Sequence, residues 1–111
     1  MVREFVEISS FTKRLREVED ASILGEIQNE ILKNPAVGAV IKGTGGIRKM
    51  RCGAEGRGKR GGHRVLCVDF PTVEKVYLLV IYAKNEQEDL SVNEKKILSQ
   101  LVERLRKELG A

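Results

Sequence analysis

The first third of the chain carries one strand pattern followed by two helix patterns. Residues 2–8 (VREFVEI) alternate partly between apolar and polar positions, which predicts a first strand. Apolar residues then recur at helical spacing and predict a helix over 11–19. A second helix is predicted to start at Asp20 or Ser22 and to stop at Asn34, because the proline after Asn34 disfavours helical geometry in the residue before it. We expect these two helices to form an antiparallel hairpin.

The remaining chain shows three strand patterns and a long terminal helix. Residues 47–52 and 63–70 are strand-like and are separated by a glycine-rich loop. Residues 75–83 (KVYLLVIYA) are nearly all apolar, which predicts a strand buried on both faces. Ser91, followed three residues later by a glutamate, fits a capping box at the start of an amphipathic helix over about 92–109. The order of elements predicts one α+β domain over 1–111.

Positive charge is concentrated between residues 42 and 64. The whole chain has 111 residues and a net charge of +4, but this segment alone holds eight basic residues and one acidic residue. The rest of the chain has 12 basic and 15 acidic residues. Eight of the 11 glycines lie in the same segment. Because glycine permits close approach to the backbone and arginine and lysine bind phosphates, the segment favours a polyanionic partner.

Composition argues against several classes of protein. No apolar run approaches the length of a membrane span, and the N-terminal sequence is not typical of a secretory signal. Two cysteines and one histidine fall short of a four-ligand zinc site, so we expect neither a metal nor a cofactor. With 5% aromatic residues a broad base-stacking platform is not expected. The expected location is the cytoplasm, with both thiols reduced.

Pairing of strands 47–52 and 63–70 around the glycine-rich loop would gather cations on one face. Arg51 would lie opposite Arg64, and Lys49 would share their face because side chains alternate along a strand. Tyr82 and Lys84 share a face on the last strand and would join this set if that strand lies beside 63–70. Such a face is exposed, paired with acids, or binds phosphate.

The same register also predicts which residues lie next to each other on the opposite face of the sheet. His63 would lie opposite Cys52 and would point away from Arg64. Cys67 would lie near Arg48, which separates the two cysteines and argues against a disulfide between them. A separate alternative for Lys84 is that the acids after it neutralise its charge; they are Glu86, Glu88 and Asp89.

Three motifs carry a resemblance that extends over nearly the whole chain. They are GTGGIRKMR at 43–51, GRGKRGGHR at 56–64 and YLLVIYAKNE at 77–86. Together with the order of elements they resemble the RelE/ParE superfamily of bacterial toxins, and most closely its HigB-type branch. RelE itself has a further arginine and a tyrosine after the lysine that matches Lys84. Here those positions read Asn85, Gln87 and Leu90, which favours the HigB-type arrangement.

The resemblance implies the toxin of a type II toxin–antitoxin pair. Such toxins cut mRNA in the ribosomal A site, without a metal, by attack of the 2′-hydroxyl on the scissile phosphate. The implied partners are a HigA-like antitoxin, the ribosome and mRNA. The implied fold is a small twisted antiparallel sheet with an N-terminal helical hairpin and a C-terminal helix. The implied catalytic residues are Arg64, Lys84, Tyr82 and Arg51, and the resemblance also matches Lys49 to a basic strand residue of the family. The charge and glycine content of the basic segment itself give the candidate RNA-binding residues, which are Arg48, Lys49, Arg57, Lys59, Arg60 and His63.

Elementary chemistry narrows the mechanism and leaves alternatives open. RNA cleavage needs a base, a group that stabilises the crowded phosphate, and an acid for the leaving oxygen. A single histidine excludes a two-histidine ribonuclease. Cationic stabilisation by Arg51 and Arg64 remains, with Lys84, Lys49 or Tyr82 moving protons. A ParE-like toxin that targets gyrase and a non-catalytic RNA- or ribosome-binding module remain as alternative functions.

Overall fold

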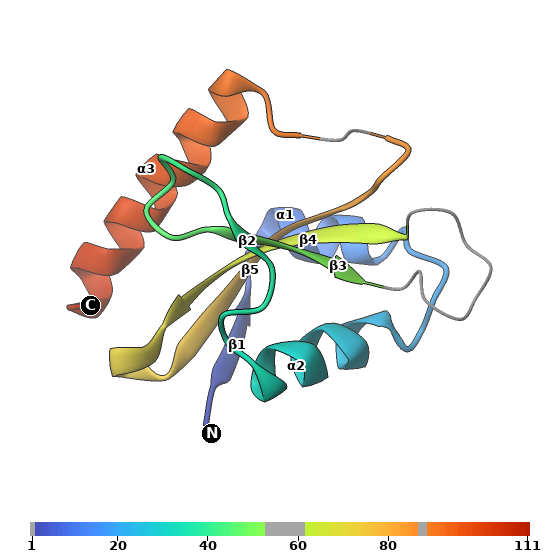
Figure 1. Cartoon of the computed structure of the whole chain (residues 1–111), viewed down its shortest axis with the longest axis horizontal. Coiled ribbons are helices and arrows are strands. Elements are labelled where there is room, and N and C mark those ends of the chain that lie inside the picture. The colour runs from blue at the N-terminus through green and yellow to red at the C-terminus, as the bar shows by residue number, and fades with distance from the viewer. Residues whose placement is uncertain (1, 53–61, 87–88) are drawn as a thin grey trace.

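The computed structural model describes residues 2–52, 62–86 and 89–111, and they form a mixed sheet with helices on both faces (Figure 1). The strands are β1 (Glu4–Glu7), β2 (Ala39–Val40), β3 (Arg48–Cys52), β4 (His63–Phe70) and β5 (Lys75–Ala83). The helices are α1 (Ser9–Leu15), α2 (Ile23–Lys33) and α3 (Val92–Leu109), with one 3₁₀ turn at Pro71–Val73. The predicted α+β class is therefore confirmed.

The sheet has the strand order β1-β5-β4-β3-β2. Its β5-β4-β3-β2 part is antiparallel, as expected, whereas β1 pairs with β5 in parallel. The parallel pair arises because the chain leaves β1 through two helices and three strands before it returns beside it as β5. The two-residue strand β2 lies between α2 and β3, where the sequence pattern predicted no strand.

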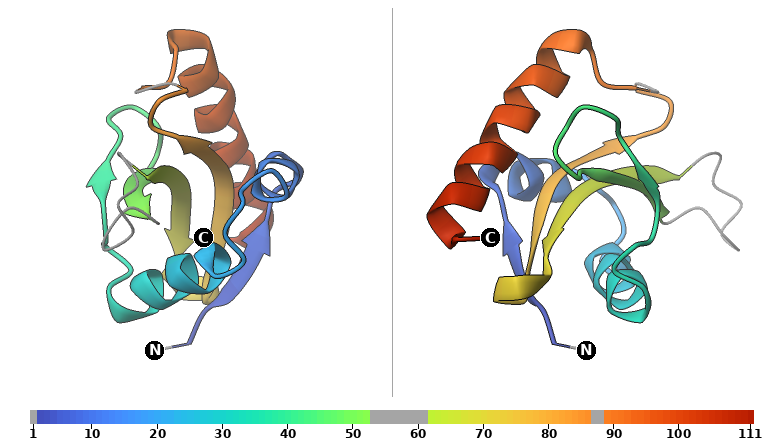
Figure 2. Two further views of the ribbon diagram at one scale, coloured as in Figure 1. Left: turned by 90° about the vertical axis from the view of Figure 1, so that its right-hand side faces the viewer. Right: turned by 60° about the vertical axis from the view of Figure 1, so that its left-hand side comes forward.

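Two hydrophobic cores occupy the two faces of the sheet. One face is covered by α1 and α2, and its core includes Phe11, Ile27 and Ile81. The other face is covered by α3, and its core includes Phe70 and Val102. Figure 2 shows α2 and α3 on opposite sides of the sheet. Helix α1 lies over β5 and α2 lies over β3, so the two N-terminal helices share a core without packing along each other's length.

Local sequence explains where α3 begins and ends. Ser91 Oγ accepts from the Glu94 backbone N–H at 3.1 Å, and Glu94 Oε1 accepts from the Ser91 N–H at 2.8 Å, so the predicted capping box is confirmed. Gly110 ends the helix with φ of 68°, a left-handed conformation that glycine adopts without strain. These caps set the two ends of α3, and α3 packs on the face of the sheet that also carries the candidate site.

The GTGG segment before β3 has a structural role in the described part of the chain. Thr44 is buried; its hydroxyl donates to the Ile41 carbonyl at 2.6 Å and accepts from the Ile47 N–H at 3.2 Å. Arg106 of α3 donates to the Gly45 carbonyl at 2.8 Å while its guanidinium lies 5.1 Å from the centre of the Phe70 ring. This turn therefore docks α3 onto the sheet.

Candidate active site

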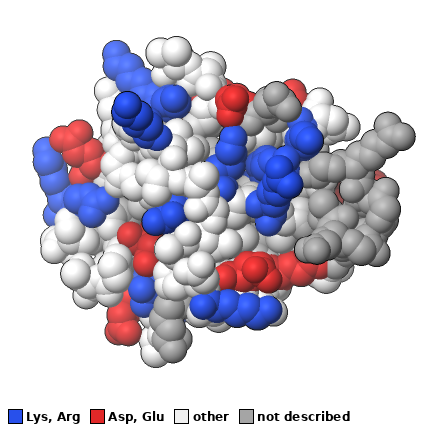
Figure 3. Space-filling view, in the orientation of Figure 1, with Lys and Arg blue, Asp and Glu red and all other residues white. Residues whose placement is uncertain are grey.

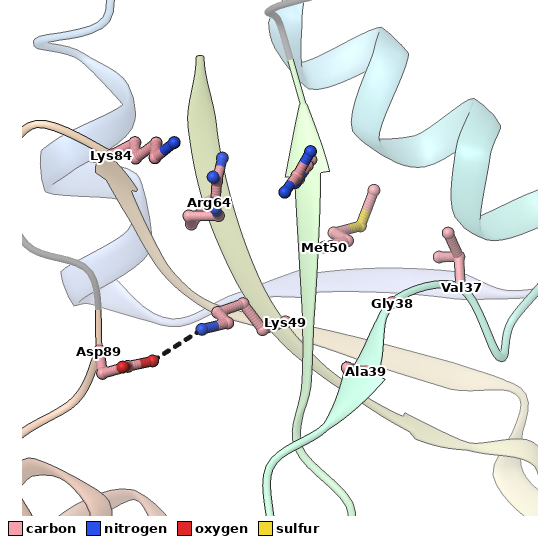
Figure 4. A pocket seen from close by; sticks show the side chains of 9 residues that line it. Val37, Gly38, Ala39, Lys49, Met50, Arg64, Lys84 and Asp89 are labelled. Atoms are coloured by element: carbon pink, nitrogen blue, oxygen red, sulfur yellow. Dashed lines mark hydrogen bonds and ion pairs between the residues drawn. The ribbon is translucent and has the colours of Figure 1, made fainter. Parts of the chain in front are cut away.

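A pocket of about 630 Å³, here called the basic pocket, opens on the α3 side of β3 and β4 (Figure 4). Its lining residues are Val37, Gly38, Ala39, Lys49, Met50, Arg51, Arg64, Lys84 and Asp89. Figure 3 shows basic side chains gathered over this part of the sheet. Four cations and one carboxylate line the pocket, so its net charge is positive.

The strand register brings the cations together as the sequence predicted. Arg51 pairs with Arg64 across β3 and β4, and Arg64 pairs with Tyr82 across β4 and β5. Paired residues lie on the same face, so Lys49, two residues before Arg51, joins them. Lys84 follows the end of β5 and also lines the pocket. The predicted convergence is therefore confirmed for Lys84, whereas Tyr82 does not line this pocket.

Arg64 is the most deeply placed of these cations. Its relative exposure is 8%, and it lies in a central strand between β3 and β5. Its Nη1 donates to the His63 carbonyl at 3.5 Å, at the long limit of a hydrogen bond. Because a guanidinium stays charged at any physiological pH, this position offers a fixed positive charge at the pocket wall.

Lys49 is paired with an acid. Its ammonium lies 2.8 Å from Asp89 Oδ1, and this hydrogen bond holds the pKa of the Asp89 carboxyl below its ordinary value. Asp89 belongs to the connector between β5 and α3. A phosphate that binds Lys49 must therefore compete with this carboxylate.

The two described acids that follow Lys84 in the sequence pair with other cations. Glu86 pairs with Arg14 and Asp89 pairs with Lys49, while Glu88 lies outside the described residues. Across residues 2–52, 62–86 and 89–111, no carboxylate is within ion-pair distance of Lys84 or of Arg51. These two cations keep their charge available to a ligand.

Tyr82 lies behind the basic pocket. Its relative exposure is 2%, and it lines a neighbouring pocket of about 290 Å³ that shares Lys49 and Asp89 with the first. Burial raises the pKa of the phenol and Asp89 raises it further, whereas Lys49 and Arg64 act in the opposite direction. The phenol is therefore neutral near pH 7 and suited to donating a hydrogen bond.

Two residues predicted to bind RNA are not in the basic pocket. The Arg48 guanidinium lies at the α2–β2 connector, where Nη1 donates to the carbonyls of Ala36 at 3.0 Å and Gly38 at 3.2 Å. His63 lies opposite Cys52 and Ala83, on the other face from Arg64, as the register predicted. The loop residues Arg57, Lys59 and Arg60 lie outside the described residues.

Five lining residues were not predicted as site residues; they are Val37, Gly38, Ala39, Met50 and Asp89, of which Gly38 and Asp89 shape the pocket most directly. Gly38 has φ of +86°, and a Cβ there would lie 2.4 Å from the Lys49 carbonyl oxygen. It is therefore required where the α2–β2 connector passes over β3. Asp89 was considered only as a neighbour of Lys84. Its actual partner lies 40 residues away in the sequence, a pairing that no local pattern indicates.

The described residues contain no cluster of three or more histidine, cysteine or acidic side chains that could hold a metal ion. Among the same residues no helix is both long and apolar enough to cross a membrane.

Comparison with known proteins identifies the class to which this fold and site belong. The sequence profile described as "RelE toxin of RelE / RelB toxin-antitoxin system" matches residues 7–109. The chain therefore belongs to the RelE toxin family. The fold is similar to that of E. coli toxin RelE in a solved structure of a double arginine-to-alanine mutant in the free state. That match has a TM-score of 0.58 and 14% identity, and it covers 79% of this chain and 90% of that chain.

Proposed function

We propose that this toxin is an endoribonuclease of the HigB type that cleaves mRNA on the ribosome by attack of a 2′-hydroxyl on the adjacent phosphate. The observation that carries the proposal is the convergence of Lys49, Arg51, Arg64 and Lys84 in one pocket. Two of these cations, Arg51 and Lys84, have no ion-pair partner among the described carboxylates, and such a cluster is what a phosphodiester with growing negative charge requires. The proposed partners are the ribosome, mRNA and a HigA-like antitoxin, in the cytoplasm.

Arg64 and Arg51 are proposed to bind the scissile phosphate. The register places them opposite each other across two neighbouring strands, so two guanidinium groups face the same space. Strands hold side chains more precisely than loops, and a preorganised charge costs no reorganisation during the reaction. Removing one such donor typically lowers the rate by about 10²- to 10³-fold.

Lys84 is proposed to donate a proton to the leaving 5′-oxygen as the P–O5′ bond breaks. The proton of the attacking 2′-hydroxyl passes to solvent water, from which Lys84 is reprotonated after the reaction. Lys49 is less suited to this role because its ammonium is occupied by Asp89. Tyr82 is proposed to support the site from behind as a neutral hydrogen-bond donor, since it lies in the neighbouring pocket and its pKa is raised. Loss of a general acid typically lowers the rate by about 10²- to 10⁴-fold.

The ribosome is proposed to supply the positioning that the pocket does not. The basic pocket is open to solvent on the surface of the sheet, and its only described carboxylate is engaged with Lys49. Holding the 2′-hydroxyl in line with the leaving group can account for a large part of the rate enhancement. We therefore expect cleavage of mRNA in the ribosomal A site and little cleavage of free RNA.

The test is induced expression of the wild type, Arg64→Ala and Lys84→Ala, with mapping of mRNA 5′ ends. Lys107→Ala is the matched control, because it removes one exposed cation from the far end of α3. We expect growth arrest with new mRNA ends in translated codons for the wild type and Lys107→Ala only. Arrest without new ends would favour gyrase or simple ribosome blocking. Ribosome binding without any cleavage would favour a binding module.

A further inference from the structure

Glu86 closes the turn that carries Lys84. The Glu86 backbone N–H donates to the Ala83 carbonyl at 3.0 Å, and Glu86 Oε1 accepts from the Ala83 N–H at 2.9 Å. Both polar groups of the Ala83 backbone are therefore bonded to the same residue. On the other side of the turn, the Lys84 N–H donates to the Gly62 carbonyl at 3.2 Å. The Lys84 backbone is therefore held by Gly62, the residue before β4, and follows Ala83, whose backbone Glu86 holds.

The Glu86 carboxylate is itself anchored to α1. Arg14 Nη2 lies 2.6 Å from Oε1 and 2.5 Å from Oε2 of Glu86, across 72 residues of sequence. Helix α1 is fixed to the sheet by Phe11, which is fully buried, and by the Ser10 hydroxyl, which donates to the Leu79 carbonyl at 2.8 Å. The Ala83 N–H and Arg14 together lower the pKa of Glu86, so the carboxylate stays ionised near neutral pH.

We propose that Glu86, braced by Arg14, is a positioning residue that fixes Lys84 over the basic pocket. The inference rests on the proposed role of Lys84 in cleavage. A lysine side chain is long and flexible, so the accuracy of its ammonium depends on the backbone from which it extends. A misplacement of about 1 Å can lower a reaction rate by about 100-fold. Glu86 is not expected to touch the RNA.

A purely structural ion pair predicts different behaviour. An exposed pair of this kind contributes little to folding stability, and its loss would change stability and all activities slightly and together. A positioning role predicts a loss in the cleavage step with binding and folding preserved. It also predicts that Glu86→Gln is milder than Glu86→Ala, because the glutamine amide oxygen can still accept from the Ala83 N–H.

The experiment is single-turnover cleavage of mRNA held in the A site of purified bacterial ribosomes. The full-length variants are Glu86→Ala, Glu86→Gln, Arg14→Met and Lys84→Ala. Glu17→Gln is the matched control, because Glu17 is the second carboxylate near Arg14, at 3.9 Å, and does not contact the turn. Toxin concentration is varied to separate the maximal rate from the half-saturating concentration. Thermal unfolding of each variant is measured in parallel.

We expect Glu86→Ala to lower the maximal rate by about 10- to 100-fold with the half-saturating concentration within about threefold of wild type. Arg14→Met and Glu86→Gln should fall between Glu86→Ala and wild type, and Glu17→Gln should match wild type. If Glu86→Ala does not fold, the intermediate rate of Arg14→Met decides the question.

Two results would overturn the inference. Full activity of Glu86→Ala beside an inactive Lys84→Ala would leave the proposed function intact and remove the role of Glu86. A loss in Glu86→Ala that follows a weaker half-saturating concentration or a lower melting temperature would show a structural pair only. Full activity of Lys84→Ala would instead refute the proposed role of Lys84, and the inference would fall with it.

Discussion

The substitution Asp89→Asn should make RNA binding stronger and more sensitive to salt. In the wild type the Asp89 carboxylate lies 2.8 Å from the Lys49 ammonium and is the only carboxylate among the described residues that line the basic pocket. Asparagine keeps the size and most of the hydrogen-bonding capacity of aspartate but removes its charge. Lys49 would then be available to an RNA phosphate.

The expected magnitude follows from the number of available cations. In the wild type Lys49 is engaged by Asp89, and in Asp89→Asn this one cation becomes available to neutralise a phosphate. For single-stranded nucleic acid, each neutralised phosphate contributes a slope of about −0.7 to the plot of log affinity against log salt concentration. The slope should therefore steepen by about 0.7 in Asp89→Asn, whatever contribution other parts of the chain make to both proteins.

The assay is fluorescence anisotropy of a labelled RNA oligonucleotide whose 2′-hydroxyls are methylated, so that it binds without being cleaved. Affinity is measured for the wild type, Asp89→Asn and the control Glu103→Gln over a range of salt concentrations. Glu103 is an exposed acid on α3 that pairs with Lys107. An unchanged slope in Asp89→Asn, or an equal change in Glu103→Gln, would refute the competition between carboxylate and phosphate. Because the pKa of Asp89 is already lowered, the difference should persist unchanged between about pH 5 and pH 8.

Three further predictions concern the scaffold and the phenol. Asp69→Ala should lower the free energy of unfolding by about 2–3 kcal/mol in chemical denaturation, because it leaves the largely buried Arg3 guanidinium without its two hydrogen bonds at 2.7 and 3.2 Å. Gly38→Ala should lower the free energy of unfolding by about 1–3 kcal/mol in the same measurement, because Gly38 has a positive φ and a Cβ would meet the Lys49 carbonyl oxygen. Gly25→Ala, in α2 with open space around it, should raise the free energy of unfolding by about 0.5–1 kcal/mol. Equal effects of the two glycine substitutions would contradict this reasoning. Spectrophotometric titration of the wild type and Tyr82→Phe should differ by one phenol ionisation, and the pKa of that phenol should lie above the ordinary tyrosine value of 10 because Tyr82 is buried. A pKa at or below 10 would show that burial does not control the ionisation of this phenol.

The predicted hairpin register was correct because its determinants are local. Strands β3 and β4 are joined by one loop, and their alternating side chains must bury Met50 and Val65 on one face. Once that face is chosen, Arg51 and Arg64 must lie together on the other. The same argument correctly predicted that Cys52 lies opposite His63 and Cys67 opposite Arg48, at different ends of the strand pair. The capping box of α3 was equally local, since its two residues are three positions apart.

The features that the sequence did not predict depend on contacts between distant segments. The parallel pairing of β1 with β5 is decided by the path of the whole chain. Alternation placed Arg48 on the face opposite Arg51, but no local pattern indicated that its guanidinium would bond to the α2–β2 connector. Asp89 and Glu86 looked alike as acids near Lys84. Only the folded chain shows that their partners are in β3 and α1.

The placement of these two carboxylates decides which cations remain available for phosphate. Four cations in one pocket repel one another, and an uncompensated cluster of this kind disfavours the folded state. The chain compensates Lys49 with Asp89, a pairing that an incoming phosphate can replace. It directs Glu86 toward Arg14 on the opposite side of the turn, so that Lys84 stays unpaired among the described carboxylates. One acid therefore reduces the repulsion in the empty pocket, while the other supports the backbone of Lys84 without neutralising it.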